Sequence, residues 1–332
     1  ILVGDIDRGG VFASLYGSVM LQTPEDRQRI KGIIINKFRG NLRLFEDGRR
    51  MIEELCQVPV LGVVPYLEDI GVEDEDSVVL DKKQRSAKDD KVNVAVVKLR
   101  HLSNFTDFNA IEQDNRLNVY YTTEKEQLLR ADIIILPGCK ATIDDLRHLK
   151  EEGVADTIRE AHRQGKTIFG ICGGYQMLGM SIDDPRQTEG DTIHIEGIGL
   201  LPMRTVMGEK KITCQTEFKL ATNSNDMCKD GVKMRGYEIH QGISTPIDKS
   251  TYKPLTIKAD GTPDGCIADS HCMGTYLHGC LDNAAMVDYL IGKKNTKSFD
   301  FAEYKEQHYN RLADHIRKHV DMAKVYDILT RQ

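Results

Sequence analysis

Residues 165–179, GKTIFGICGGYQMLG, place a single cysteine between glycines where two patterns meet. The apolar run 166–171 predicts a buried strand, and residues 174–180 continue with the pattern of a helix. A strand that leads directly into a helix is the building unit of a parallel sheet covered by helices. This stretch therefore predicts an α/β fold, with Cys172 at the turn between strand and helix.

The spacing G-x-C-x-G around Cys172 is the thiol form of a nucleophile elbow. Small residues at 170 and 174 let a strained backbone push the side chain outward, and the positive end of the following helix stabilises a thiolate. The alternative is a buried small apolar side chain, which is what most free cysteines are. The glycines and the strand–helix junction favour a nucleophile, with the Gly173 N–H group available to an oxyanion.

A second oxyanion donor and a base are expected at neighbouring strand ends. The run 131–138, ADIIILPG, ends in a Pro-Gly turn, where Gly138 lets the backbone approach a substrate oxygen, although such a turn is also common without any function. Among ten histidines, His278 follows a strand-like run and precedes a glycine, so it is placed on a strand-end loop. His240 is a weaker candidate of the same kind. We predict that His278 is the base that serves Cys172.

Alternating strand and helix patterns extend on both sides of this stretch. Continuous apolar runs predict further strands at 1–4, 31–38, 58–66, 92–99 and 117–123, with helical segments between them. Dense mixed charge at 72–91 predicts a solvated linker, and the chain becomes richer in strands from residue 191 onward.

Composition excludes several classes of function. The 332 residues carry 45 basic and 51 acidic side chains, and a net charge of -6 argues against a nucleic-acid binder. No apolar run approaches the roughly 20 residues that a membrane span needs. The eight cysteines are scattered, without a C-x-x-C pair, so we expect reduced thiols and a cytoplasmic location.

Three motifs together resemble the glutamine amidotransferase domain of the cobyric acid synthase group: GICGGYQMLG (170–179), ILPGCKATIDDL (135–146) and GTYLHGCLDN (274–283). The resemblance extends over nearly the whole chain through six further motifs: DIDRGGVFASLYG, IINKFRGN, PVLGVVPYLEDIG, LSNFTDF, RGYEIHQG and RLADHIRKH. It implies a class I amidotransferase α/β domain.

The same resemblance implies a reaction and its substrates. Cys172 would form a glutamyl thioester with glutamine, and His278 would protonate the departing ammonia and then activate water. The amides of Gly138 and Gly173 would hold the oxyanion. The ammonia would amidate ATP-activated carboxylates of a corrinoid, converting adenosylcobyrinic a,c-diamide to cobyric acid on the path to cobalamin.

One departure concerns the third member of a catalytic triad. Class I domains usually carry an acidic residue two positions after the histidine, and this chain has Cys280 there. Glu238 and Asp282 are the alternatives for a third member, and a Cys–His dyad also remains open.

The first seventy residues resemble the second half of a P-loop ATPase related to dethiobiotin synthetase. By that resemblance, Asp5 and Asp7 would hold a metal ion, and Asn36 with Lys37 would form an adenine-side loop; as an alternative, strand-end aspartates often cap helices. The motif G-x-x-x-x-G-K-[ST] does not occur in the sequence. We therefore expect a partial nucleotide site in a chain without its N-terminal P-loop segment, with ATP and Mg²⁺ used by the complete enzyme and no bound organic cofactor here.

These observations predict four parts. Residues 1–71 would be the C-terminal part of the ATPase domain, 72–91 a charged linker, 92–292 the amidotransferase domain and 293–332 a helical tail that packs on a core. Three other readings stay open: an a,c-diamide synthase or other amide ligase of the same group, a cysteine hydrolase that is not a ligase, and a non-catalytic scaffold.

Overall fold

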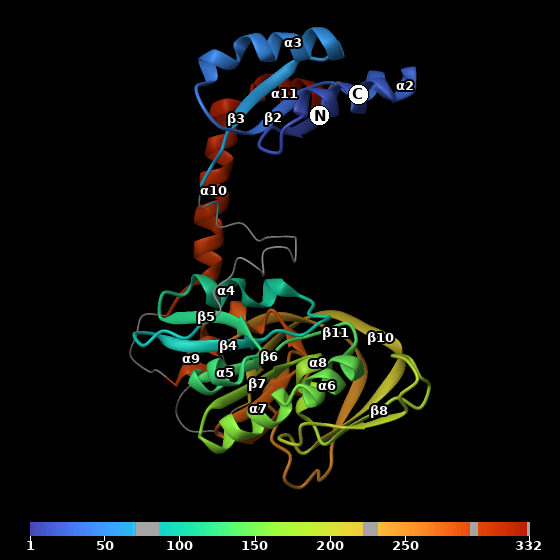
Figure 1. Ribbon diagram of the computed structural model, residues 1–332, viewed down its shortest axis with the longest axis vertical. Coiled ribbons are helices and arrows are strands. Elements are labelled where there is room, and N and C mark those ends of the chain that lie inside the picture. Colours follow the sequence, from blue (N-terminus) through green and yellow to red (C-terminus); the bar gives the residue numbers. More distant parts are fainter. Residues whose placement is uncertain (69, 71–85, 222–231, 293–297, 331–332) are drawn as a thin grey trace. The chain divides into compact units, whose positions relative to one another are not determined.

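The computed structural model describes residues 1–68, 70, 86–221, 232–292 and 298–330 (Figure 1). The chain forms two compact units, of which the first joins Ile1–Val72 to Glu303–Gln332 and the second comprises Glu73–Ala302. Most of the charged segment expected at 72–91 lies outside the described residues.

The first unit contains a three-stranded parallel sheet. Its strands run in the order β1 (Leu2–Asp5), β2 (Ile33–Phe38) and β3 (Val60–Pro65), which confirms the strands expected in this region. The helical elements that connect them are α1 (Val11–Met20), α2 (Pro24–Arg29), η1 (Leu42–Phe45) and α3 (Glu46–Cys56). Apolar side chains of α1 and α3 pack with Ile33 and Ile35 and form the core of this unit.

The end of the chain also packs on this sheet. Two helices close the sequence, α10 (Phe301–His319) and α11 (Met322–Thr330). Val320, between them, is buried with Leu61 and Val64 of β3, and Ile316 and Met322 pack against the same cluster. The apolar stripe near the C-terminus therefore covers part of the N-terminal sheet.

The second unit is built on a six-stranded sheet in the order β14-β15-β7-β6-β4-β5. Its strands are β4 (Val92–Val97), β5 (Leu117–Thr122), β6 (Ile133–Leu136), β7 (Thr167–Ile171), β14 (Cys266–Asp269) and β15 (Cys272–Thr275). All neighbouring pairs are parallel except β14 with β15. Its helical elements are η3 (Phe105–Phe108), α4 (Asn109–Gln113), α5 (Lys125–Arg130), α6 (Thr142–Glu151), α7 (Val154–Arg163), α8 (Gly173–Leu178) and α9 (Ala284–Ile291). The α/β pattern predicted from the central strands is confirmed.

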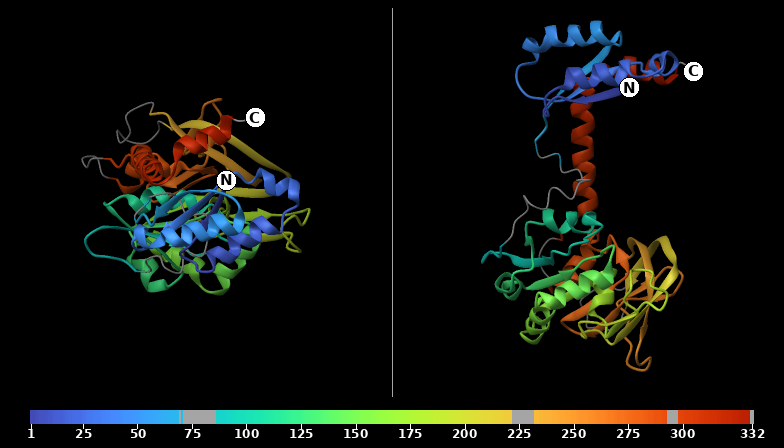
Figure 2. Two further views of the ribbon diagram at one scale, coloured as in Figure 1. Left: turned by 90° about the horizontal axis from the view of Figure 1, so that it is seen from above. Right: turned by 45° about the vertical axis from the view of Figure 1, so that its right-hand side comes forward.

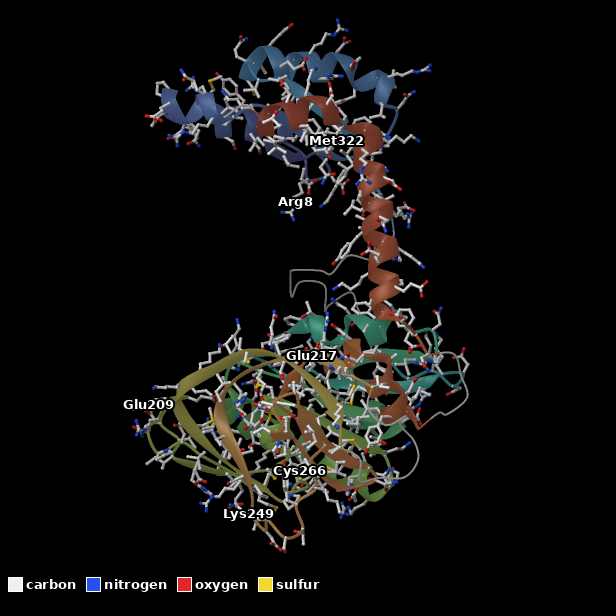
Figure 3. All side chains as sticks on the ribbon, turned by 180° about the vertical axis from the view of Figure 1, so that it is seen from behind. Arg8, Glu209, Glu217, Lys249, Cys266 and Met322 are labelled. Carbon is white, nitrogen blue, oxygen red and sulfur yellow. The ribbon has the colours of Figure 1, made fainter. Side chains whose placement is uncertain are left out.

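A second sheet, of seven strands, lies beside the first (Figure 2). It consists of β8 (Ser181–Asp183), β9 (His194–Glu196), β10 (Met203–Leu220), β11 (Met234–Pro246), β12 (Thr256–Lys258), β13 (Pro263–Asp264) and β16 (Leu277–His278). The long strands β10 and β11 pair antiparallel, with an irregularity between Met207 and Ile212. Figure 3 labels Glu209 and Glu217 at two points along the curved β10. The strand-rich pattern expected after residue 191 is confirmed.

The chain passes from one sheet to the other just before His278. Strand β15 ends at Thr275 in the six-stranded sheet, and β16 begins at Leu277 in the seven-stranded sheet. Because β16 pairs with β11, His278 lies opposite Tyr237, and the short turn η4 (Cys280–Asp282) follows. This crossing brings His278 to the boundary between the sheets.

In the described part of the chain, no helix has the length and apolar character to cross a membrane.

Candidate active site

Cys172 is a strained residue at the junction of β7 and α8. Its backbone has φ 51° and ψ -107°, which is unusual for any residue other than glycine. The flanking glycines are required by close packing: a Cβ on Gly174 would lie 1.9 Å from the Leu136 carbonyl oxygen, and one on Gly170 would lie 2.7 Å from the Tyr175 nitrogen. The turn predicted from G-x-C-x-G is therefore present, and it depends on both glycines.

The Cys172 side chain borders a cavity of about 370 Å³. Other residues that line the cavity are Asn104, Gln176, Glu189, His240 and His278. Cys172 as a whole residue is 8% exposed, and its Sγ atom lies 3.5 Å from the carbonyl oxygen of Ile239. A small substrate entering this cavity would therefore meet a largely buried thiol.

His278 is held by a buried carboxylate, Asp107. The His278 Nδ1 atom lies 2.6 Å from Asp107 Oδ2, and the Gly279 N–H group donates to Asp107 Oδ1 at 2.8 Å. Both side chains are almost fully buried. The Tyr237 ring stacks on the imidazole, with 5.2 Å between the ring centroids. The imidazole is therefore held in one orientation, with Nδ1 directed to the carboxylate.

The pKa of His278 reflects these partners. Burial by itself lowers this pKa, but the hydrogen bond with Asp107 and then the one with Cys172 outweigh it and raise the pKa to about 10. At neutral pH the ring is therefore an imidazolium that faces the cysteine on one side and a carboxylate on the other.

The two glycines expected to bind an oxyanion both lie beside this pair. A Cβ on Gly138 would be 2.8 Å from His278 Cε1 and 3.6 Å from Cys172 Cβ. A Cβ on Gly173 would be 2.8 Å from the Sγ atom of Cys139. The structure thus brings Cys172, His278, Gly138 and Gly173 to one place, and it leaves no room for a side chain at either glycine.

The carboxylate at His278 differs from the two that the sequence suggested. Glu238 instead accepts two hydrogen bonds from Lys258 Nζ, at 3.0 and 3.1 Å, and its pKa is lowered first by His240 and then by Lys258. Asp282 lies in η4, where its N–H group donates to the Gly279 carbonyl oxygen at 3.2 Å. Of the three carboxylates, Asp107 is the one hydrogen-bonded to the His278 imidazole, at 2.6 Å, whereas Glu238 and Asp282, the two candidates from the sequence, have the partners given above.

A signal for Asp107 was present in the sequence. Asp107 belongs to LSNFTDF, which follows the strand 92–97, and loops after parallel strands collect functional side chains. Asn104 of the same motif has a left-handed backbone, with φ 55°, and its Nδ2 atom lies 3.0 Å from each ring nitrogen of His278. The sequence of this motif alone does not predict a role for either residue.

The residues expected at a nucleotide site meet at the ends of β1 and β2. Asp5 lies opposite Asn36 in the sheet, and Lys37 Nζ donates to Asp5 Oδ2 at 2.9 Å, which lowers the pKa of Asp5. Asp7 forms an ion pair with Arg39, with 2.6 Å between Asp7 Oδ1 and Arg39 Nε. Arg39 was not among the residues predicted for this site. Within the described residues, no group of three or more His, Cys, Asp or Glu side chains is arranged to hold a metal ion.

Comparison with known families matches both units. Residues 93–286 match the CobB/CobQ-like glutamine amidotransferase domain, and residues 5–78 match the CobQ/CobB/MinD/ParA nucleotide binding domain. Among solved structures, the chain is similar to the structure of PurLQS from Thermotoga maritima. The match covers 61% of this chain and 98% of the matched chain, with 19% sequence identity and a TM-score of 0.46.

Curated relatives match along almost the entire chain. The cobyric acid synthase of Phocaeicola vulgatus is 51% identical over 335 residues, and that of Alkaliphilus metalliredigens is 42% identical over 347 residues. Each alignment covers 99% of this chain, whereas it covers 66% and 68% of the respective relative. The family matches confirm the predicted fold class, a nucleotide-binding segment followed by a glutamine amidotransferase domain. The chain belongs to the cobyric acid synthase family.

Proposed function

We propose that this chain hydrolyses glutamine at Cys172 and delivers the ammonia to a corrinoid carboxylate. The observation that carries the proposal is the buried arrangement in which Asp107 holds His278 and His278 faces Cys172 beside a cavity. A cysteine next to an imidazolium is an activated nucleophile, because the positive charge favours the thiolate.

The proposed reaction proceeds in two halves. The Cys172 thiolate attacks the carboxamide carbon of glutamine, and the amides of Gly138 and Gly173 stabilise the oxyanion of the tetrahedral intermediate. The imidazolium of His278 donates its proton to the departing nitrogen, so ammonia leaves and a thioester remains. His278 then takes a proton from water, the hydroxide attacks the thioester, and glutamate and the free thiol are released.

The family match supports a use for the ammonia. We propose that an ATP-activated carboxylate of the corrin ring accepts it, in the conversion of adenosylcobyrinic a,c-diamide to cobyric acid. We place this reaction in the cytoplasm, because seven cysteines of the described chain are free thiols.

Ammonia release tests the glutamine half of the proposal. The chain incubated with glutamine is expected to produce glutamate and ammonia in equal amounts, because each thioester cycle yields one of each. Asparagine, shorter by one methylene, is the matched control and should react far more slowly, since its carboxamide would not reach Cys172 from the same binding position. A cysteine hydrolase of another class would release no ammonia from glutamine, and that result would contradict the proposal.

We further propose that Asp5, Asp7, Asn36 and Lys37 belong to an ATP site. Magnesium in nucleotide sites is commonly held by one or two carboxylates together with phosphate oxygens, and Asp5 and Asp7 are carboxylates at a strand end. Arg39, which pairs with Asp7, adds positive charge beside these carboxylates, and a guanidinium is a common partner of phosphate groups.

Asp5→Asn is expected to weaken the binding of ATP about tenfold when magnesium is present and much less in its absence. The reason is that the substitution removes a carboxylate proposed to bind the magnesium ion. Titration calorimetry of the chain with and without magnesium measures both values. The matched control is Asp47→Asn, which removes an exposed carboxylate paired with Arg50 in α3. Equal effects of the two substitutions would exclude Asp5 from the site.

A further inference from the structure

Thr275 connects the nucleophile to the base. It is the last residue of β15 and lies opposite Ile171 of β7, and its carbonyl oxygen accepts a hydrogen bond of 2.8 Å from the N–H group of Cys172. His278 follows three residues later, after the chain has passed into the seven-stranded sheet. Residues 275–277, the crossing segment, therefore link a strand that is hydrogen-bonded to Cys172 with the base itself.

A buried carboxylate, Asp264 of β13, holds the crossing segment. Asp264 Oδ2 accepts a hydrogen bond from the Thr275 hydroxyl, and Asp264 Oδ1 accepts one of 3.2 Å from the Tyr276 N–H group. Thr275 Oγ1 in turn accepts a hydrogen bond of 3.0 Å from the Leu277 N–H group. The N–H groups of Tyr276 and Leu277 are thus bound to Asp264 directly or through one hydroxyl.

The residues that carry Asp264 lie against the backbone of β15. Gly265 has a left-handed backbone with φ 72°, and a Cβ on it would lie 2.3 Å from the Gly274 carbonyl oxygen and 3.2 Å from Thr275 Cα. Cys266, labelled in Figure 3, pairs with Gly274 where β14 begins. Backbone contact as well as hydrogen bonding therefore sets the position of the carboxylate relative to Thr275.

A carboxylate is costly at this place. Asp264 is 5% exposed, and its hydrogen-bond partners are the hydroxyls of Thr275 and Thr256 and one backbone N–H group, none of which carries a positive charge. Burial raises the pKa of Asp264 and the nearby Glu238 adds to this, whereas the three hydrogen bonds oppose it. Because a buried carboxylate without a cationic partner costs stability, Asp264 is explained better by the segment that it holds than by packing.

We infer that Asp264 is a positioning residue for His278: it holds the crossing segment in one conformation, and that conformation sets the place of the imidazole relative to Cys172. The inference rests on the proposed hydrolysis of glutamine. Neither Asp264 nor Thr275 lines the cavity, so the effect on the reaction acts through His278 and not through contact with the substrate. A displacement of a catalytic group by about 1 Å can lower a rate about a hundredfold.

Thr275→Val and Thr256→Val form a matched pair of tests. Both threonines are fully buried and both donate to the same oxygen of Asp264, so each substitution exchanges a hydroxyl for a methyl group and removes one donor from the same acceptor. Only Thr275 belongs to the crossing segment. Thr275→Ser keeps the hydroxyl and is the conservative variant, and Asp264→Ala removes the carboxylate itself.

Three properties are measured in each variant. Steady-state rates of ammonia release give kcat and KM for glutamine, and thermal unfolding followed by circular dichroism gives the melting temperature. NMR titration of the chain with isotopically labelled histidine gives the pKa of His278, whose signal is identified by its loss in His278→Ala. The NMR measurement reports on the imidazole without any turnover.

In Thr275→Val we expect kcat to fall by a factor of about 10 to 100 and KM to stay within about twofold, because the base moves while the cavity keeps its lining. Burial lowers the pKa of His278, and the hydrogen bonds with Asp107 and then Cys172 raise it to about 10. A displaced imidazole has a weaker hydrogen bond with Cys172, so this pKa should fall.

The other variants should separate positioning from stability. Asp264→Ala should lower both kcat and the pKa of His278, and Thr275→Ser should restore both. Thr256→Val should lower the melting temperature about as much as Thr275→Val does, since each loses one buried hydrogen bond, but it should leave kcat and the pKa of His278 unchanged.

Unchanged kcat and an unchanged pKa of His278 in Thr275→Val would overturn the inference. Equal losses of kcat in Thr275→Val and Thr256→Val would also overturn it, because Asp264 would then act only on stability. The threonine pair decides the question even if Asp264→Ala does not fold. Absence of ammonia release from the unsubstituted chain would refute the proposed hydrolysis, and the pKa of His278 would still show whether Asp264 positions the imidazole.

Discussion

Cys172→Ser is expected to lower the rate of ammonia release from glutamine by about a thousandfold or more. Serine keeps the shape of the side chain, but its hydroxyl is a much poorer nucleophile than a cysteine sulfur next to an imidazolium. The strained backbone at this residue tolerates the change, since both side chains are small. Steady-state rates under saturating glutamine measure the effect, with circular dichroism to verify the fold.

The matched control is Cys139→Ser in the same cavity. Cys139 lies next to Gly173, but burial raises its pKa well above the usual range, so it stays a thiol and a poor nucleophile. Its substitution should change the rate by no more than a few fold. A glutamine-analogue electrophile should label Cys172 first among the eight cysteines. Dominant labelling of Cys139, or equal losses in the two variants, would refute the assignment.

The second large effect is expected for His278→Ala, which should also reduce turnover by about a thousandfold or more. The variant loses the proton donor for the leaving ammonia and the base for water in the second half of the reaction. It also removes the positive charge beside the Cys172 side chain. Both rapid-quench detection of the thioester and steady-state rates measure the loss.

His240→Ala is the control for this substitution, because His240 lines the same cavity but is hydrogen-bonded to the Gly242 carbonyl oxygen and packed on Tyr276. We expect a smaller effect on kcat than in His278→Ala. A larger loss in His240→Ala than in His278→Ala would mean that His240 is the base and that the assignment of His278 is wrong.

The pH dependence of kcat/KM tests whether Asp107 raises the pKa of His278. The protonated His278 is needed as the acid, so kcat/KM should fall as the pH rises through its pKa of about 10. Asp107 raises this pKa, and Asp107→Asn should therefore move the alkaline limb to lower pH. Glu238→Gln, which removes a carboxylate paired with Lys258, should leave the limb in place.

The order of strands and helices in both units could be predicted from the sequence, because it depends on local patterns. Runs such as 94–97 and 133–136 are continuously apolar, which is typical of strands buried on both faces. The pairing of the C-terminal helices with β3 could not be predicted, although the apolar stripe was visible. A stripe shows that a helix is covered on one side, but several cores in the chain could have covered it.

The turn at Cys172 is the clearest feature that the sequence determined by itself. Its conformation requires glycines two residues before and after, and these neighbours are part of the same short segment. The prediction of His278 rested on an equally local sign, the end of a strand followed by glycine. Backbone requirements of this kind can be recognised in a sequence because the residues that satisfy them are adjacent.

The partners of these residues were decided only by the tertiary structure. Asp107 is 171 residues from His278, and Tyr276 is 100 residues from Gln176. Such pairs form because the loop after β4 and the crossing from β15 to β16 meet where the two sheets adjoin, and nothing in the local pattern of either segment records that meeting. Asp282 lies only four residues after His278 in the sequence, but hydrogen bonding depends on distance in space. Only the packing of the sheets determines which carboxylate lies within 3 Å of the imidazole.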